Sequence, residues 1–230
     1  MPIVKYPRTP HISGSRLQPG DEDLEVIARE DLESRSLVIE EKLDGSNSGI
    51  SFNRDGALTL QSRGHALSGG PREGQFDLLK RWANHHVAAL REILGQRYIM
   101  YGEWLYARHT IPYDQLPHYF LEFDILDRES GDFLSTDARQ RLVAGGPVVS
   151  VPVLGLVSVR EIDSYVGRSR VSSTELMEGL YLKREKGTCV TERYKYIRPG
   201  FLQAVADSGS HWADRPIEPN RLRDGVDLFA

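Results

Sequence analysis

The sequence predicts a single α+β domain built mainly from antiparallel strands. Short apolar runs separated by Gly, Asn and Asp turn residues recur from residue 37 to residue 198, as in a meandering sheet. One segment, residues 73–94, instead repeats its apolar side chains every three or four residues, which is typical of an amphipathic helix. No internal repeat and no linker divides the 230 residues, so we expect one domain spanning residues 1–230.

Composition excludes several classes of protein. Hydrophobic residues make up 40% and charged residues 27%, which rules out a collagen-like, disordered or disulfide-scaffold chain. No apolar run approaches the roughly 20 residues of a membrane span, and no apolar signal region is seen, so we expect no membrane association and a cytoplasmic location. The lone Cys189 excludes an internal disulfide and a thiolate-rich zinc site. The net charge of −4 argues against coating nucleic acid through bulk charge, but allows a small basic groove.

The first part of the chain is expected to hold an entry segment, a helix and three strands. Residues 1–20 are rich in Pro, Gly, Ser and Arg and predict an irregular entry segment. The acidic residues 21–33 have spaced apolar positions and predict a short helix. The apolar run at 37–43 predicts a strand that ends in the turn at 44–47. Two further strands joined by a hairpin turn follow, judged from Ile50, Phe52, Leu58 and Leu60 around residues 53–56.

The second part of the chain is expected to alternate strands with short helices. The expected elements are strands at 98–101 and 119–125, a helix at 136–145, an edge strand at 148–159, one or two helices within 160–178, and strands at 179–184 and 192–198. The tail from about residue 208 is weakly patterned. We expect no C-terminal OB-fold domain, because too few residues follow the last strand.

One lysine stands where an apolar strand gives way to a tight turn. It is Lys42, within the run from Glu41 to Asn47. A nucleophilic lysine needs a rigid position and a pKa lowered by desolvation or a neighbouring cation. Asp44, two residues on, shares the strand face if the strand persists and would help to hold a metal nearby. Alone, this heptapeptide favours a surface lysine before an Asp-Gly turn, because turn formation explains Asp44 and Gly45 without a function.

Four downstream segments place charged and aromatic side chains at strand ends. Glu103 alone is an ordinary strand-end carboxylate, Phe123 alone is a core residue, and Arg63 before a glycine is usually a solvated hairpin arginine. Residues 183–198 are locally basic and indicate where phosphates would lie, or else a solvated face. Their order along the chain favours a site, and the segments are Gln61–Gly64, Tyr101–Trp104, Phe120–Ile125, and Glu178–Lys183 with Arg193–Arg198.

In this order the segments resemble motifs I, Ia, III, IIIa, IV and V of the covalent nucleotidyltransferases, which include DNA ligases, RNA ligases and mRNA capping enzymes. The resemblance spans residues 41–198 and is nearest to ATP-dependent RNA ligases of the RNA ligase 2 group. It rests on Tyr101–Trp104 followed by His109–Tyr113, and on Phe123–Ile125, which are characteristic of RNA ligases. It implies two antiparallel β-sheets flanked by helices, with ATP in the groove between them.

The resemblance also implies a role for each matching residue. Lys42 would attack the α-phosphorus of ATP and become lysyl-AMP. Catalytic Mg²⁺ or Mn²⁺ would be held by Asp44 and Glu178. Phosphate charge would be neutralised by Lys183, Arg193 and Lys195. The family usually has lysine at the position of Arg193; arginine keeps the positive charge but donates through a planar, branched guanidinium and not from a single point. The nucleotide would be bound by Glu41 at the adenine edge, Phe123 stacked on the adenine, Glu103 at the ribose, and Asn47 and Arg63 at the ribose and phosphate.

The expected reaction joins a 3′-hydroxyl and a 5′-phosphate at nicked or broken RNA ends through an adenylated 5′-end. A divalent ion would favour the free amine of Lys42 and offset charge on the phosphate, and scattered carboxylates suit magnesium. The alternatives are a small ATP-dependent DNA ligase acting on a nicked DNA-containing duplex, a capping-type guanylyl transferase, and a non-catalytic module that binds nucleotide or RNA ends. Because no clamp domain is expected, the grip on RNA is expected either to be weak or to come from a partner protein.

Overall fold

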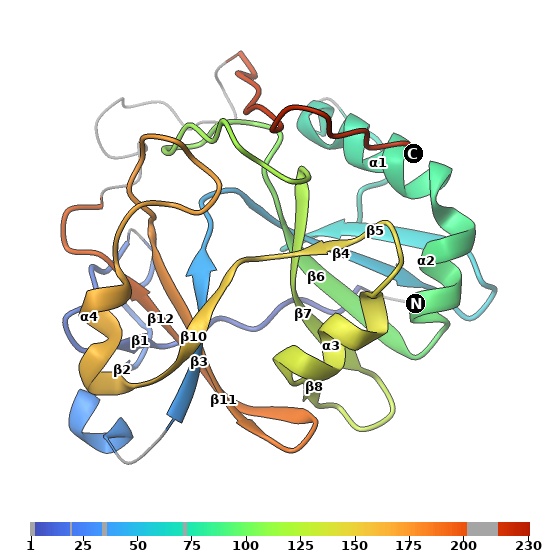
Figure 1. The fold of residues 1–230 in the computed structure, drawn as a ribbon. Coiled ribbons are helices and arrows are strands. Elements are labelled where there is room, and N and C mark those ends of the chain that lie inside the picture. Colours follow the sequence, from blue (N-terminus) through green and yellow to red (C-terminus); the bar gives the residue numbers. More distant parts are fainter. Residues whose placement is uncertain (1–2, 19, 34–35, 71–72, 202–215) are drawn as a thin grey trace.

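A computed structural model describes residues 3–18, 20–33, 36–70, 73–201 and 216–230. Its main feature is one hydrogen-bonded sheet of twelve strands within these residues, with helices on its outer sides (Figure 1). Within the described residues, no helix is both long and apolar enough to cross a membrane. The sheet-rich α+β class predicted from the sequence is confirmed.

The sheet has two halves that meet at a short strand. One half contains, in spatial order, β10 (Val153–Ser158), β3 (Ser36–Lys42), β11 (Gly179–Lys186) and β12 (Cys189–Ile197). The other contains β7 (Phe120–Asp127), β6 (Tyr98–Trp104), β4 (Ser46–Phe52) and β5 (Leu58–Ser62). The two-residue strand β8 (Phe133–Leu134) pairs with both β12 and β7. The hydrogen bonding is therefore continuous through β8, whereas the sequence predicted two separate sheets.

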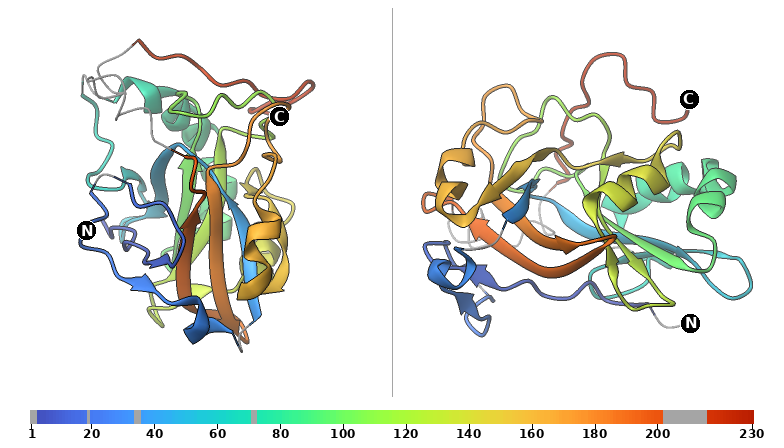
Figure 2. Two further views of the ribbon diagram at one scale, coloured as in Figure 1. Left: turned by 90° about the vertical axis from the view of Figure 1, so that its left-hand side faces the viewer. Right: turned by 60° about the horizontal axis from the view of Figure 1, so that its bottom comes forward.

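Three short parallel pairings complete the sheet. Strand β1 (His11–Ile12) lies beside β12, with His11 opposite Lys195. Strand β2 (Val26–Ile27) pairs with β1, and β9 (Val149–Ser150) pairs with β7. These pairings tie the N-terminal segment to the last strand of the chain, and Figure 2 shows that segment running along one side of the sheet.

Each half of the sheet has its own apolar core. Helices α1 (Asp77–His85) and α2 (Val87–Leu94) pack on β4 and β6, where Trp82 and Leu90 join the larger core cluster. Helix α4 (Ile162–Tyr165) covers β10 and β3, and its Ile162 joins the second cluster. Helix α3 (Thr136–Val143) packs on β7, and Ser135 caps it by accepting a hydrogen bond from Ala138 N. The space between the halves is consequently lined by strands.

Most sequence predictions of secondary structure are confirmed. The hairpin of β4 and β5, strands β3, β6, β7, β11 and β12, and helix α3 lie where the apolar patterns indicated. The predicted edge strand at 148–159 is divided into β9 and the edge strand β10.

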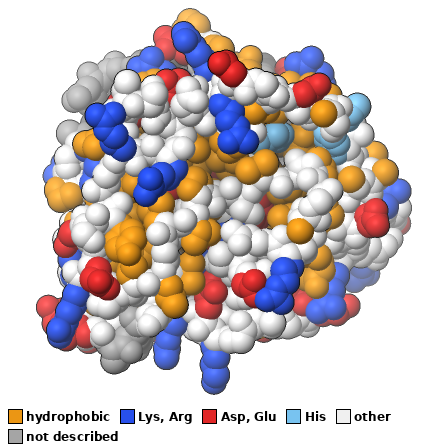
Figure 3. All heavy atoms as spheres, viewed as in Figure 1, with side chains coloured by type: hydrophobic (Ala, Val, Ile, Leu, Met, Phe, Trp, Pro, Cys, Tyr) orange, Lys and Arg blue, Asp and Glu red, His pale blue; other side chains and the backbone are white. Residues whose placement is uncertain are grey.

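Hydrophobic side chains gather on the face of the molecule where β10 lies (Figure 3). Two hydrophobic side chains of β10, Val153 and Leu156, are exposed.

Three helix predictions need correction. Residues 21–33 form no α-helix, because their backbone pairs with β1 instead, and they hold only β2 and the 3₁₀ turn η1 (Arg29–Leu32). The helix expected at 73–94 begins with the turn η2 (Gly74–Phe76) and is broken at His86, whose ψ of 19° leaves the helical region. Residues 160–178 hold only the end of the turn η3 (Val159–Glu161) and the one-turn helix α4.

The described part of the tail, residues 216–230, has no helix or strand but is anchored. Asn220 is buried, accepts a hydrogen bond from Tyr113 N and donates to the carbonyl of Leu105. His85 and His86 donate to the carbonyls of Phe229 and Leu228. The first residues of the tail that the sequence singled out, 208–215, lie outside the described residues.

Candidate active site

A cavity of about 200 Å³ opens between the two halves of the sheet. Strands β3, β11 and β12 line it from one half, and β4, β6 and β7 from the other. Of the site residues predicted from the sequence, eight line this cavity: Glu41, Lys42, Asn47, Arg63, Glu103, Phe123, Glu178 and Lys195. The sequence order of the motifs thus corresponds to one place in the fold.

Lys42 stands at the end of β3, held by a two-pronged ion pair. Its Nζ lies 2.7 Å and 2.8 Å from the two carboxylate oxygens of Glu178, whose side chain is 1% exposed. Strand pairing sets this contact, because Gly179 lies opposite Lys42 in the β3–β11 register. A Cβ at Gly179 would come within 2.0 Å of the carbonyl oxygen of Tyr196, so only glycine lets β11 approach β12 this closely.

The lysine and its carboxylates shift each other's protonation. Burial alone lowers the pKa of Lys42, but the negative charges of Glu178, Glu103 and Asp44 outweigh burial and raise it. Burial raises the pKa of Glu178 to about 7 and that of Glu103 to about 8, against the opposing charge of Lys42. Lys42 is therefore an ammonium at neutral pH, and the pKa values of the carboxyl groups of Glu178 and Glu103 beside it lie near neutrality.

A second lysine reaches the cavity from β12. Lys195 Nζ lies 2.7 Å from Asp21 Oδ2, and the same oxygen lies 2.9 Å from His11 Nε2. Burial lowers the pKa of Lys195, and the Asp21 carboxylate opposes that shift. Two amines thus face one cavity, Lys42 paired with Glu178 and Lys195 paired with Asp21.

The cavity lining also includes an aromatic ring and acceptor atoms that have no hydrogen-bond partner in the described residues. The ring of Phe123 is partly buried and meets the ring of Tyr6 edge-on at a centroid distance of 5.1 Å. Glu41 is 1% exposed; its Oε2 accepts a hydrogen bond from Arg170 N at 2.8 Å, whereas its Oε1 has no partner within the described residues. The Oδ1 of Asn47 is likewise buried and unpartnered in the described part of the chain. Such atoms call for a donor from a ligand or water.

Asp44, the other carboxylate predicted to hold the metal, is not among the residues that line the cavity. Its Oδ2 accepts hydrogen bonds from the backbone of Thr110 at 2.7 Å and of Ile111 at 3.0 Å, and its own N–H donates to Tyr113 Oη. Gly45 beside it allows the close approach of Trp104 O, which would lie 2.7 Å from a Cβ. Asp44 thus anchors the segment after β6 to the turn after Lys42.

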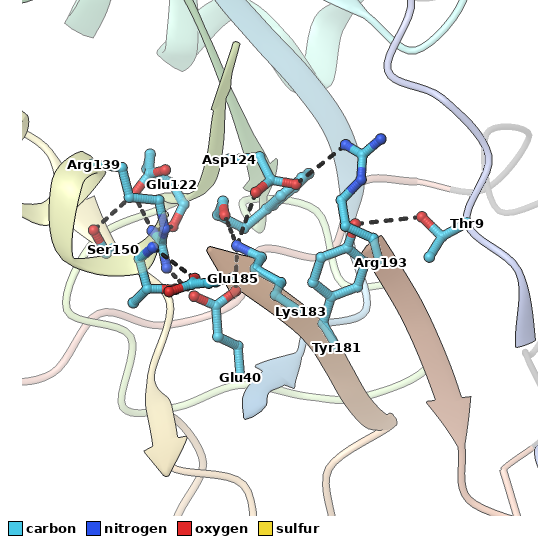
Figure 4. A network of polar contacts seen from close by, with 12 residues as sticks. Thr9, Glu40, Glu122, Asp124, Arg139, Ser150, Tyr181, Lys183, Glu185 and Arg193 are labelled. Atoms are coloured by element: carbon cyan, nitrogen blue, oxygen red, sulfur yellow. Dashed lines mark hydrogen bonds and ion pairs between the residues drawn. The ribbon is translucent and has the colours of Figure 1, made fainter. Parts of the chain in front are cut away.

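Lys183 and Arg193, predicted to neutralise phosphate charge, are likewise not among the residues that line the cavity. Lys183 belongs to a set of five charged side chains with no exposed surface, which we call the buried charge network: Glu40, Glu122, Asp124, Arg139 and Lys183. Its Nζ lies 2.8 Å from Glu40 and 2.8 Å from Asp124 and donates to the carbonyl of Phe123. Figure 4 shows it pointing between these two carboxylates.

The rest of the network also consists of buried ion pairs and hydrogen bonds, although Glu122 Oε1 and Arg139 Nε have no hydrogen-bond partner within the described residues. Arg139 of α3 pairs with Glu40 and Glu122, and Ser150 donates to Glu122. Burial lowers the pKa of Lys183 to about 8 and raises that of Glu122 to about 8. Arg193 stands at the edge, 3.7 Å from Asp124, with its guanidinium 3.8 Å from the ring centre of Phe133. The network joins the two halves of the sheet behind Phe123.

One wall of the cavity was not anticipated from the sequence. It comes from the N-terminal segment, which has no apolar period, so pattern analysis gave no signal for it. Two features of the segment identify it only in the structure: the pairing of β1 with β12 and the ion pair from Asp21 to Lys195. The lining residues of this wall are Tyr6, Pro7, Arg8, Thr9, Gln18, Asp21 and Leu24.

Oxygen donors suited to a hard cation are present, but sparse. Within the described residues, no group of three or more His, Cys, Asp or Glu side chains is arranged to hold a metal ion. The carboxylates of Glu103 and Glu178 both line the cavity. Mg²⁺ typically uses one or two carboxylates and completes its shell with water and substrate phosphates, so this donor set fits it.

Known structures share this fold. A variant of the Naegleria gruberi RNA ligase solved with ATP and Mn, carrying alanine in place of a lysine, has a TM-score of 0.59 and 21% identity over 86% of this chain and 62% of that one. A glutamate-to-alanine variant with AMP and Mn has a TM-score of 0.59 and 21% identity over 85% and 56%. An apo aspartate-to-alanine variant has a TM-score of 0.55 and 21% identity over 74% and 51%. The chain thus spans between half and two thirds of their length.

Comparison by sequence gives the family. No curated protein matches the chain. The model of the RNA ligase family matches residues 35–197, which run from β3 to β12 and include every strand that lines the cavity. Because this match covers well over half of the chain, the chain belongs to the RNA ligase family.

Proposed function

We propose that this chain is an ATP-dependent RNA ligase that works through a lysyl-AMP intermediate at Lys42. The observation that carries the proposal is the placement of the Lys42 amine, clamped by Glu178, at a cavity that also holds the Lys195 amine. An amine nucleophile beside a second cation is the arrangement that attack on a phosphorus atom requires.

The proposed reaction has three balanced steps. The Lys42 ammonium first gives a proton to solvent; its nitrogen then forms a bond to the α-phosphorus of ATP and releases a second proton, while the bond to pyrophosphate breaks. A 5′-phosphate oxygen of the RNA then displaces the Lys42 nitrogen, which takes up a proton, from the phosphorus and gives an adenylated 5′-end. Finally the 3′-hydroxyl oxygen of the other end attacks the 5′-phosphate and gives its proton to solvent, AMP leaves, and a phosphodiester forms. All three steps depend on positioning and charge stabilisation more than on acid–base strength.

The base end of the cavity supports adenine as the nucleobase. The free carboxylate oxygen of Glu41 accepts a hydrogen bond from the 6-amino group of adenine, whereas guanine would present a carbonyl oxygen to it and be repelled. The Phe123 ring supplies a stacking face. In this proposal Asn47, Arg63 and Glu103 bind the ribose and phosphates, and the nucleotide lies between the two halves of the sheet.

The phosphate end of the cavity combines cations with carboxylates. Lys195 neutralises the α-phosphate, and Arg63, which also lines the cavity, adds positive charge. Glu178 and Glu103 are the carboxylates that would hold Mg²⁺ or Mn²⁺, the latter being present in two of the compared Naegleria structures. When bound, the ion offsets charge on the phosphate and favours the free amine of Lys42. Asp44, Lys183 and Arg193 act from outside the cavity by holding its walls.

A sealing assay tests the proposed activity. Purified protein, ATP and Mg²⁺ are incubated with a duplex carrying a nick with 3′-hydroxyl and 5′-phosphate ends, in an all-RNA and an all-DNA version. We expect sealing of the RNA nick and none with Lys42→Ala. Preferential sealing of DNA would instead identify a DNA nick ligase. Failure to seal either nick, together with binding of RNA ends, would identify a non-catalytic module.

A further inference from the structure

The N-terminal segment, which precedes the family match, forms one wall of the cavity. Strand β1 pairs with β12, Lys195 N donates to Pro10 O at 2.9 Å, and Arg16 N donates to Ile197 O at 2.9 Å. Figure 2 shows the segment, coloured blue, lying along the side of the sheet that carries β12. The wall is therefore fixed to the strand that supplies Lys195.

One carboxylate of this wall points at the cations of the cavity. Asp21 Oδ2 accepts hydrogen bonds from Lys195 Nζ at 2.7 Å and His11 Nε2 at 2.9 Å, and Asp21 Oδ1 lies 3.7 Å from the guanidinium of Arg8. His11 is fully buried, and its Nδ1 lies 2.6 Å from Ser15 Oγ. The side chains of Asp21 and Lys195 are each only 15% exposed. Asp21 thus occupies the position of an anion among three basic groups.

Asp21 carries its negative charge at neutral pH, because its pKa is lowered. Burial alone would raise the pKa of Asp21, but hydrogen bonds from His11 and Lys195 outweigh burial and lower it. A bound phosphate at Lys195 would therefore meet a negative charge already paired with the same ammonium. In a partly enclosed cavity, such repulsion is screened less than in bulk water.

We propose that Asp21 sets the affinity of the site for ATP by acting as an internal anion that competes with the phosphate for Lys195. This inference rests on the proposed function, in which Lys195 binds the α-phosphate. The carboxylate holds the Lys195 amine in the cavity until ATP binds, and it then opposes the bound phosphate. In the competing account, Asp21 only positions Lys195. That account predicts weaker binding of the ATP analogue when the charge of Asp21 is removed, whereas our proposal predicts tighter binding.

Asp21→Asn separates the two accounts, because asparagine keeps an acceptor oxygen for Lys195 and loses the charge. The probe is α,β-methylene ATP, which carries the triphosphate but cannot transfer AMP, and its Kd is measured by calorimetry. We expect Asp21→Asn to bind it about five- to tenfold more tightly, as for one charge pair at intermediate dielectric. Adenosine, which has no phosphate, should bind both proteins equally.

Asp23→Asn is the matched control. Asp23 also pairs with Arg8, at 2.7 Å, but its side chain is 72% exposed and does not line the cavity. Its substitution should change neither Kd. Asp21→Ala is a second variant without the charge and should also bind the analogue more tightly, so a folding defect of one variant does not decide the outcome. Unchanged or weaker binding of the analogue by both Asp21 variants would overturn the proposal.

Adenylation of wild-type Lys42 by ATP is scored in the same preparations. If wild-type protein is adenylated and the Asp21 variants bind the analogue no more tightly, only the role of Asp21 is wrong. If wild-type protein neither binds the analogue nor becomes adenylated, the proposed function fails, and the role of Asp21 fails with it.

Discussion

The cavity and the buried charge network both place a lysine of the last two strands among carboxylates, but they differ in what surrounds it. Lys195 faces a cavity that contains unpartnered acceptors on Glu41 and Asn47. Lys183 has no exposed surface and is enclosed by Glu40, Asp124 and the carbonyl of Phe123. The first arrangement has room for a ligand. The second also contains buried atoms without a hydrogen-bond partner in the described residues, among them Glu122 Oε1 and Arg139 Nε, but it has no exposed surface at which a ligand could enter. Access to the cavity therefore distinguishes the two lysines, although both belong to matching motifs.

The difference has a simple origin in strand geometry. Lys183 on β11 lies opposite Arg193 on β12. Lys195 follows Arg193 by two residues, so the side chains of Arg193 and Lys195 lie on the same face of β12. Two residues of a strand span about 7 Å, enough to move a side chain from the network to the cavity. Glu40 and Phe123 touch both places, so the network supports the floor on which the nucleobase is proposed to stack.

The largest expected effect comes from breaking the network. Lys183→Met removes the cation that Glu40 and Asp124 share and leaves these buried carboxylates to Arg139 and Arg193 alone, which should destabilise the fold by about 3–5 kcal/mol. Urea unfolding followed by circular dichroism measures this change. If the variant were as stable as wild type but no longer adenylated, Lys183 would take part in the reaction, and the proposed difference between Lys183 and Lys195 would be wrong.

The matching change in the cavity should affect rate and leave stability almost unaltered. Lys195→Met removes the cation proposed to stabilise the α-phosphate, and we expect adenylation to slow by about 10²–10³-fold. Its free energy of unfolding should stay within about 1 kcal/mol of wild type, because Lys195 is partly exposed and one ion pair is lost. Single-turnover incorporation of labelled AMP gives the rate. A large loss of stability with an unaltered rate would reverse the two roles.

A smaller effect is expected at the base end of the cavity. Glu41→Gln replaces the free acceptor with an amide that can either donate or accept, so discrimination of ATP from GTP in the adenylation step should fall by about tenfold or more. Glu92→Gln, at an exposed carboxylate of α2, serves as the control and should leave the ratio unchanged. An unaltered ratio in Glu41→Gln would remove Glu41 from base recognition.

The smallest effect concerns the protonation of Lys42. Glu178 and its neighbours raise the pKa of Lys42 against the effect of burial, so Glu178→Gln should lower that pKa. The rate of labelling of Lys42 by an amine-reactive reagent, measured against pH without ATP, reports it. The midpoint should move to lower pH in Glu178→Gln and stay in place in Glu92→Gln. A shift to higher pH would contradict the ion pair.

Strands with regular apolar patterns were predictable from the sequence, and so was the meeting of the motifs. Lys42, Glu103, Phe123 and Glu178 lie at the ends or centres of such strands, and pairing brings them together. The wall around Asp21 was not predictable, because it follows an irregular segment whose position depends on pairing with a strand at the far end of the chain. The same pairing explains why the acidic stretch at 21–33 is not a helix.

Motif matches also could not tell a contact with the nucleotide from support of the cavity. Asp44 sits two residues after Lys42, as a metal ligand would, yet its carboxylate binds the backbone of Thr110 and Ile111. Lys183 was expected near a phosphate, and its side chain instead enters the space between Glu40 and Asp124. Whether a motif residue faces the cavity depends on how deeply its side chain is buried and on which groups it pairs with. Both depend on tertiary packing, which a motif match does not contain.

The most direct test of the central claim is the mass of the protein after incubation with ATP and Mg²⁺, followed by peptide mapping at alkaline pH, where a phosphoramidate survives. The account predicts a gain of one adenylyl group, located on Lys42, and no gain with Lys42→Ala. An adduct on another residue, or the same gain in Lys42→Ala, would contradict the assignment of the nucleophile. No gain in wild-type protein would contradict the proposed chemistry itself.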